Sequence, residues 1–137
     1  MKAVILSDGS CIGNPGPASI GAVVKIGNHI SQISRCIGPA TNNIAEYQAL
    51  IAGLEEAQRL KANSIEVWLD SELVLKQLLG KYRVKDAKLI PLYNKAKKLL
   101  SVFFTCSLKK ASRDENKQAH TLAHKALRAT DSSHAAE

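Results

Sequence analysis

Five short apolar segments, each bounded by turn or helix-capping residues, constrain the fold of this chain most strongly. Runs of four to eight residues rich in Val and Ile are typical of buried β-strands. The predicted strands are Ala3–Ser7, Ile20–Lys25, Ile30–Ile37, Ile65–Leu69 and Val102–Leu108. Between the first two strands, Cys11–Pro17 is predicted as a loop because it contains two glycines and two prolines, so helices are predicted only after the third strand.

Helices are predicted where apolar residues recur every three or four positions. The first opens at the capping residues Thr41–Asn43 and runs to about Lys61, with an apolar stripe of Tyr47, Leu50, Leu54 and Ala57. Three more are predicted at Leu73–Leu79, at Leu89–Leu100 with Pro91 near its start, and from about Asp114 to Ala129.

The order of these elements predicts the topology. A Gly27–Asn28 turn joins the second and third strands into a hairpin. The later strands alternate with helices, which implies parallel pairing and helical cover. We therefore predict an α/β fold, a single domain over residues 1–130 and a disordered tail at 131–137.

Charge is distributed unevenly along the chain. There are 19 Lys and Arg against 12 Asp and Glu, giving a formal charge of +7. The window from Lys76 to Arg113 holds eleven of the bases and one acid, Asp86. A basic segment with an interleaved aromatic such as Tyr82 can follow a phosphate backbone, but lysines on a helix can also form only a solvated face.

Composition and run length exclude two protein classes. A content of 45% hydrophobic and 23% charged residues is that of a packed domain and not of a disordered chain. The longest apolar runs, such as Ala3–Leu6, are far shorter than the ~20 residues of a membrane helix. No secretory signal pattern follows Lys2, so a cytoplasmic location is expected. The scattered Cys11, Cys36 and Cys106 are expected as small hydrophobes or incidental thiols, with a disulfide as the alternative.

Three acids stand where a predicted strand ends or a helix begins: Asp8, Glu46 and Asp70. In open α/β sheets such ends converge on the crevice that binds ligands. Each acid also has a purely structural explanation. Asp8 can be a turn residue, Glu46 can complete a capping box with Asn43, and Asp70 can cap the next helix.

Together the three acids predict a cation site. Gathered carboxylates repel one another and raise one another's pKa unless a cation neutralises them. Oxygen ligands favour hard ions such as Mg²⁺ or Mn²⁺, whose coordination is often completed by substrate phosphates.

Four motifs in order resemble the type 1 ribonucleases H, and the resemblance extends from Ala3 to about Ala129. The motifs are Ser7–Ser10 followed by Gly13–Pro17, then Ala40–Glu46, then Leu69–Ser71, and last Arg113–Ala119 leading into Leu122–Ala123. The resemblance implies a ribonuclease H-like fold, a five-stranded mixed sheet with strands 1–3 antiparallel, strands 4–5 parallel and helices on both faces. It also implies metal-dependent cleavage of the RNA strand of RNA/DNA hybrids.

The resemblance further implies roles for individual residues. Two metal ions would bracket the scissile phosphate, with Asp8 bridging both while Glu46 and Asp70 hold the leaving-group ion. Substrate contacts are expected from Asn14 and Thr41 to a DNA phosphate, from Asn42 and Asn43 to RNA 2′-hydroxyls or bases, and from Lys85 and Arg113. Lys85 lies in the basic stretch Lys76–Lys98, which is expected to hold the duplex backbone.

The chain departs from the family at the fourth metal ligand. The family has Asp within Asn-x-x-Ala-Asp-x-Leu-Ala, and here that position is His120. An imidazole can still bind a divalent ion, with a preference for Mn²⁺ or Zn²⁺ over Mg²⁺, or act as a base. We expect His120 to be a catalytic metal ligand or a near neighbour of the metal. The alternatives are a solvent-facing histidine and a zinc site shared with His124.

Three functions follow from these observations. The leading hypothesis is an active hybrid ribonuclease that uses Mg²⁺ or Mn²⁺, with no membrane association and no obligate protein partner. The alternative is a protein that binds hybrid or double-stranded RNA and has lost turnover with the fourth Asp. A nuclease acting mainly on double-stranded RNA shares the same site and stays open.

Overall fold

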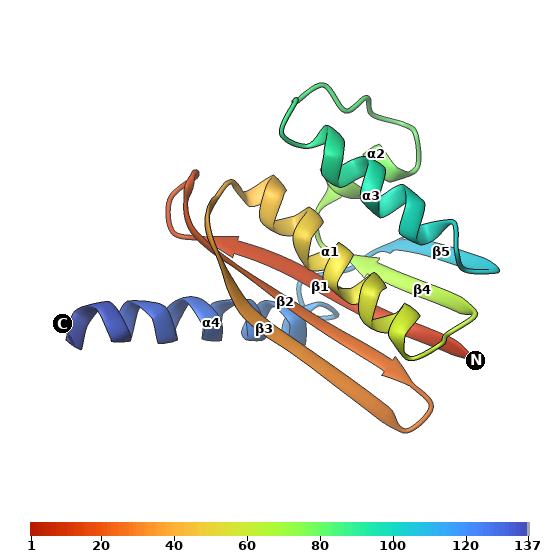
Figure 1. The fold of residues 1–137 in the computed structure, drawn as a ribbon, viewed down its shortest axis with the longest axis horizontal. Coiled ribbons are helices and arrows are strands. Elements are labelled where there is room, and N and C mark those ends of the chain that lie inside the picture. The colour runs from red at the N-terminus through yellow and green to blue at the C-terminus, as the bar shows by residue number, and fades with distance from the viewer. Residues whose placement is uncertain (137) are drawn as a thin grey trace.

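One mixed sheet of five strands organises the molecule (Figure 1). The computed structural model describes residues 1–136, and side chains as far as residue 129. The strands lie in the order β3-β2-β1-β4-β5. β1 and β3 are antiparallel to β2, whereas β4 is parallel to both β1 and β5, which confirms the predicted sheet. Their bounds are β1 Lys2–Cys11, β2 Gly16–Ile26, β3 His29–Ala40, β4 Ser64–Leu69 and β5 Thr105–Lys110.

Helices cover both faces of the sheet, as predicted. α1 (Asn42–Arg59) packs on β1 and β2 and against α3 (Ile90–Leu100), while α4 (Lys117–Ala136) packs on the opposite face against β1, β2 and β3. Figure 1 shows α4 crossing behind the strands that α1 covers in front. α2 (Glu72–Leu78) is a short helix that begins three residues after β4 ends.

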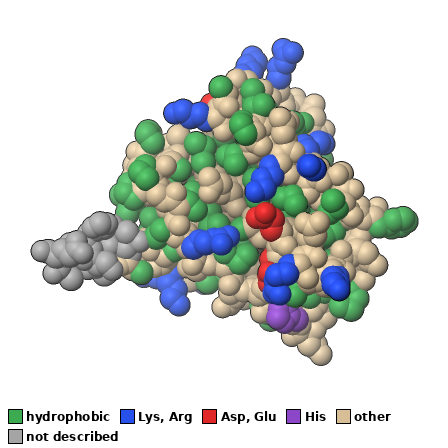
Figure 2. Space-filling view, viewed as in Figure 1, with side chains coloured by type: hydrophobic (Ala, Val, Ile, Leu, Met, Phe, Trp, Pro, Cys, Tyr) green, Lys and Arg blue, Asp and Glu red, His purple; other side chains and the backbone are tan. Residues whose placement is uncertain are grey.

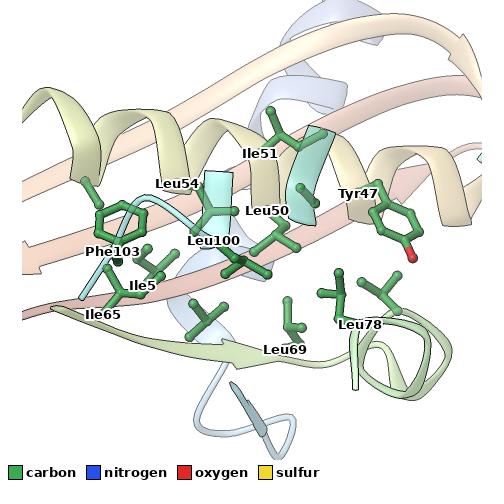
Figure 3. Close-up of a cluster of buried hydrophobic side chains, with 14 of the residues drawn as sticks. Ile5, Tyr47, Leu50, Ile51, Leu54, Ile65, Leu69, Leu78, Leu100 and Phe103 are labelled. Carbon is green, nitrogen blue, oxygen red and sulfur yellow. The ribbon is translucent and has the colours of Figure 1, made fainter. Parts of the chain in front are cut away.

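The main core lies between the sheet and α1. All four residues of the predicted α1 stripe, from Tyr47 to Ala57, are fully buried. They pack with β1, β4, α2 and α3 side chains such as Ile5, Leu69, Leu78 and Leu100 (Figure 3). Tyr47 lies at the α2 end of this cluster and donates its hydroxyl proton to Gln77 Oε1 at 2.5 Å. This packing fixes the start of α1 relative to the end of β4.

The end of the first strand differs from the sequence prediction. Asp8–Gly9 was predicted as a turn after Ser7, but β1 continues to Cys11. β2 supplies antiparallel partners for the extra residues, from Gly21 opposite Asp8 to Ala18 opposite Cys11. Because these pairs satisfy the backbone groups, tertiary pairing overrides the local turn signal.

Two later elements are shifted along the chain. β5 was predicted at Val102–Leu108 and lies at Thr105–Lys110, because Val102 and Phe103 instead make turn hydrogen bonds to Leu99 and Leu100 at the end of α3. α4 was predicted from Asp114 and begins at Lys117, after a turn capped reciprocally by Ser112 and Glu115 at 2.9 and 3.1 Å.

Some expectations concern the chain's ends and its compartment. The α4 backbone extends to Ala136, but side chains of residues 130–137 lie outside the described part, so the domain limit at 130 and the disorder of 131–137 stay predictions. Among the described residues the cysteines form no disulfide. None of the helices described is both long and apolar enough to cross a membrane. The cytoplasmic location stays a prediction.

Candidate active site

Asp8 and Asp70 follow the last paired residues of two neighbouring parallel strands, β1 and β4, at the carboxyl end of that pair. The pairing of β1 with β4 ends at Ser7 opposite Leu69, and each acid is the next residue of its strand's chain. Asp8 is only 3% exposed, whereas Asp70 is partly exposed. The expected convergence of strand ends therefore holds for these two residues, even though β1 itself continues.

A close approach between α1 and β1 brings Glu46 to Asp8. A Cβ atom on Gly9 would lie 2.4 Å from the backbone carbon of Ala45, so only glycine allows this contact. At this distance the Gly9 N–H donates to Glu46 Oε1 at 3.2 Å. The capping-box explanation of Glu46 is wrong, because Thr41 is the N-cap and its hydroxyl accepts from the Ile44 N–H at 3.2 Å.

Glu46 carries the electrostatic signature of a gathered acid cluster. Burial raises its pKa well above the usual range, and the charge and hydrogen bonding of Asp8 and, more weakly, the charge of Asp70 raise it further. The hydrogen bond from Gly9 opposes this shift in part. Glu46 Oε2 is buried with no hydrogen-bond partner in the described chain. Burial and the two neighbouring carboxylates therefore both disfavour the ionised form of Glu46.

His120 reaches the cluster from α4, on the other face of the sheet. Its Nδ1 lies 2.7 Å from Asp8 Oδ2, while 48% of its side chain is exposed. The His124 ring, one turn along, lies 4.5 Å from the His120 ring between centroids. Because an ionised carboxylate only accepts, Nδ1 carries the proton in this contact, which leaves Nε2 of a neutral His120 as the acceptor.

Asp70 has a basic partner that the sequence did not indicate. Lys110, at the end of β5, donates a hydrogen bond to the Asp70 carbonyl oxygen, and its Nζ lies 3.6 Å from Asp70 Oδ1. Both side chains are partly exposed, at 49% and 40%. Lys110 therefore supplies a positive charge at the edge of the acid cluster.

The donor set fits a hard divalent cation. Its oxygens include the buried, unpartnered Glu46 Oε2. Burial, together with repulsion from Asp8 and Asp70, raises the pKa of Glu46, and a bound cation would oppose both effects. Within the described residues no three His, Cys, Asp or Glu side chains already surround one common metal position.

Four predicted substrate contacts cluster near the start of α1. Asn14, in the loop between β1 and β2, accepts at Oδ1 from the Asn42 N–H at 3.0 Å. Asn42 and Asn43 begin α1, and Asn42 is exposed. Thr41 is partly exposed and already uses its hydroxyl as the helix cap. The loop and the helix start therefore present these polar side chains as one group.

The two predicted basic contacts come from other segments of the chain. Lys85 is exposed in the segment between α2 and α3, and Arg113 is exposed in the turn before α4. No hydrogen bond or ion pair in the described part of the chain joins either to Asp8, Glu46, Asp70 or His120. Figure 2 shows Lys and Arg side chains scattered singly over the α1 and α3 face rather than merged into one continuous strip.

Comparison with known proteins assigns the family. A family model described as reverse transcriptase-like matches residues 6–126. The solved structure of the N-terminal RNase H domain of a bifunctional Mycobacterium tuberculosis protein is 42% identical and has a TM-score of 0.89. The match covers 92% of this chain and 98% of that one. This chain belongs to the type 1 ribonuclease H family. The fold predicted from the sequence is that of its structural relatives.

Two further ribonuclease H structures are similar along nearly their whole length. RNase H1 of Halobacterium salinarum is 40% identical with a TM-score of 0.89, covering 93% of this chain and 98% of that one. LC11-RNase H1, crystallised with an RNA/DNA hybrid, is 33% identical with a TM-score of 0.84 and the same coverage. The full bifunctional M. tuberculosis protein is 43% identical over 140 residues, but this chain spans only 38% of its length.

Sequence reasoning missed the residues that set the spacing of the candidate site. Gly9 and Gly21 permit close helix approaches, and a glycine inside a strand is a recognisable signal of such an approach. The buried Asn116 contacts β1 beneath the site. No pattern in the sequence near Lys110 predicts its contact with Asp70, because the two residues are 40 positions apart.

Proposed function

We propose that this protein is a metal-dependent endonuclease that hydrolyses the RNA strand of RNA/DNA hybrids. The observation that carries the proposal is the gathering of Glu46 with Asp8 and Asp70, with one buried carboxylate oxygen of Glu46 left unpartnered. Such an arrangement destabilises a fold and suits a cation-binding site. Family membership supports the reaction, and a relative crystallised with an RNA/DNA hybrid supports the substrate.

We propose that Asp8, Glu46 and Asp70 hold two divalent ions, Mg²⁺ or Mn²⁺, with Asp8 shared between them. Bound ions of this kind lower the pKa of a water nucleophile and stabilise the oxygen that leaves. Glu46 is oriented for this role by the Gly9 N–H. Lys110, beside Asp70, carries the positive charge that would suit a substrate phosphate at this edge of the site.

His120 acts on the site through Asp8 in this proposal. Its Nδ1–H donates to Asp8 Oδ2, which fixes the orientation of that carboxylate. Its Nε2 can ligate a cation or act as a base. Because the imidazole replaces an anion, the site has one repulsive charge fewer than the family pattern, and a preference for Mn²⁺ follows.

The substrate contacts complete the proposal. Asn14 and Thr41 hold a DNA-strand phosphate, while Asn42 and Asn43 contact RNA 2′-hydroxyls or bases, since a 2′-hydroxyl both donates and accepts. Lys85 and Arg113 contribute positive charge along the duplex, whose binding should weaken with salt. These assignments rest on the clustering of the polar group at the start of α1 and on the exposure of the two basic residues.

One observation favours a second candidate function, binding without turnover. His120 already occupies an oxygen of Asp8, the residue proposed to bridge both ions. A protein that holds hybrid or double-stranded RNA without cutting it would have no need of that oxygen. The costly gathering of three acids argues for the enzyme, because a binding protein gains nothing from their repulsion.

Cleavage of matched duplexes tests the proposal. An RNA/DNA hybrid, a double-stranded RNA and a double-stranded DNA of one sequence, each labelled in turn on either strand, are incubated with Mg²⁺, Mn²⁺ or EDTA. We expect cation-dependent cuts in the RNA of the hybrid alone. Binding of the hybrid without cuts in either ion, together with rapid cutting by His120→Asp, would establish the binding protein instead.

A further inference from the structure

α4 docks unusually close to the strand that faces Asp8. A Cβ atom on Gly21 would lie 2.1 Å from the Ala119 carbonyl oxygen and 2.5 Å from the Ala123 nitrogen, so any side chain there would push the helix outward. Gly21 is the cross-strand partner of Asp8, and Ala119 directly precedes His120. Because Gly21 has no side chain, α4 can pack closely against β2 beside Asp8.

Asn116 fixes the same helix to β1. Asn116 directly precedes α4, one helical turn before His120, and is only 1% exposed. Its Nδ2 donates a hydrogen bond to the Ser7 carbonyl oxygen at 2.9 Å. Ser7 is the neighbour of Asp8 in the chain. The Asn116 Oδ1 atom is buried with no partner among the described residues, so the bond to Ser7 is the one hydrogen bond that this amide makes there.

Other hydrogen bonds hold α4 to the sheet farther from Asp8. Ser19, buried in β2, donates to the Ala123 carbonyl oxygen at 2.6 Å. Ser34, in β3, donates to the Leu122 carbonyl oxygen at 2.6 Å. These contacts support the docking of the helix but touch neither Asp8 nor the residue beside it. Ser19 is therefore a matched reference for Asn116.

We propose that Gly21 and Asn116 are positioning residues for the cleavage reaction. Gly21 sets the depth of α4 and Asn116 sets its position along β1, and together they hold His120 Nδ1 2.7 Å from Asp8 Oδ2. As far as catalysis is concerned, this inference rests on the proposed function. A displacement of about 1 Å in a catalytic group can cost on the order of 100-fold in rate.

The test compares Asn116→Ala with Ser19→Ala in the full chain. Three quantities are measured for each: Tm, the NMR signals of the His120 imidazole in EDTA, and the single-turnover rate and affinity for a labelled hybrid with Mn²⁺. Both variants lose one buried hydrogen bond, so both should lose Tm by similar amounts. Only Asn116→Ala should shift the His120 signals, and only it should slow cleavage by about tenfold or more with affinity within about threefold.

Two additional variants keep the test decisive. Asn116→Leu keeps four side-chain heavy atoms in the same branched arrangement, so it leaves no cavity where the alanine variant does, and it removes the unpartnered oxygen. It should show the same His120 shift and slow rate. Gly21→Ala should show both changes with a larger loss of Tm.

Two results would overturn the positioning role. One is an unchanged His120 signal and rate in Asn116→Leu, and the other is an equal loss of rate in Ser19→Ala. If the native protein cuts no hybrid with any cation, the proposed function fails. The His120 signals, recorded without cation or substrate, still decide whether Gly21 and Asn116 position the histidine.

Discussion

Replacing Glu46 with Gln should stabilise the protein when no divalent cation is bound. Glu46 Oε2 is buried without a partner, and burial, Asp8 and Asp70 all raise the pKa of this carboxyl. A buried hydrogen-bond acceptor left unpaired lowers the free energy of unfolding by about 1–3 kcal/mol. The neutral amide of the Glu46→Gln variant removes the part of this loss that is due to the charge of the carboxylate. At roughly 3–5 °C per kcal/mol for a domain of this size, Tm should rise by several degrees.

The gain from Glu46→Gln has a definite dependence on pH. The pKa of Glu46 is higher in the folded protein than in the unfolded chain, so the native protein carries no penalty below the unfolded value of about 4.3. The penalty develops as pH rises through the folded value. The difference in Tm between variant and native protein should therefore be large near neutral pH and shrink as pH falls toward about 4.

Thermal unfolding in EDTA, followed by circular dichroism at neutral and acidic pH, measures this difference. Glu56→Gln, on the same helix, is the matched control with the opposite sign. Hydrogen bonds from Arg59 and Ser31 lower the pKa of Glu56 to about 2, so its loss should cost about 1 kcal/mol at neutral pH after allowance for the exposure of Arg59. A lower Tm for Glu46→Gln near neutral pH, or a gain that does not change with pH, would refute the reasoning.

Three further changes have expected outcomes of their own. Thr41→Ala removes the α1 N-cap and should lower the free energy of unfolding by about 1 kcal/mol in urea titrations, and an unchanged midpoint would contradict the capping role. Tyr47→Phe leaves Gln77 Oε1 buried without its donor and should cost about 1–3 kcal/mol in the same assay, whereas a neutral effect would show that the bond contributes nothing net. Lys110→Gln removes the cation beside Asp70 and should lower the Mn²⁺ concentration needed for half of the cation-induced rise in Tm, and an equal or higher concentration would show that Lys110 does not compete with the metal.

The topology could be predicted because it follows from local signals that agree with one another. The β-branched runs, the Gly27–Asn28 turn and the Thr41 cap each describe a few adjacent residues, and the structure retains all three. The gathering of Asp8 with Asp70 also follows from topology alone, since both lie at the carboxyl end of one parallel pair.

The remaining features depend on contacts between distant segments. β1 passes through Asp8–Gly9 because β2 pairs with it, although the dipeptide alone is a turn signal. Glu46 matches a capping box with Asn43 in sequence, yet it accepts from Gly9, 37 residues away. Gly21 in β2 sets how closely α4 packs on the sheet, and the apolar periodicity of α4 does not predict this.

Single-turnover cleavage of an RNA/DNA hybrid, with the RNA strand end-labelled, tests the central claim most directly. The native protein and Asp70→Asn are compared at saturating protein with Mg²⁺, with Mn²⁺ and with EDTA. We predict RNA cleavage by the native protein only when a cation is present. For Asp70→Asn we predict a cleavage rate that is lower than the native rate by a factor of about 100 or more. Equal rates for the two proteins, or no cleavage by the native protein in either cation, would contradict the account.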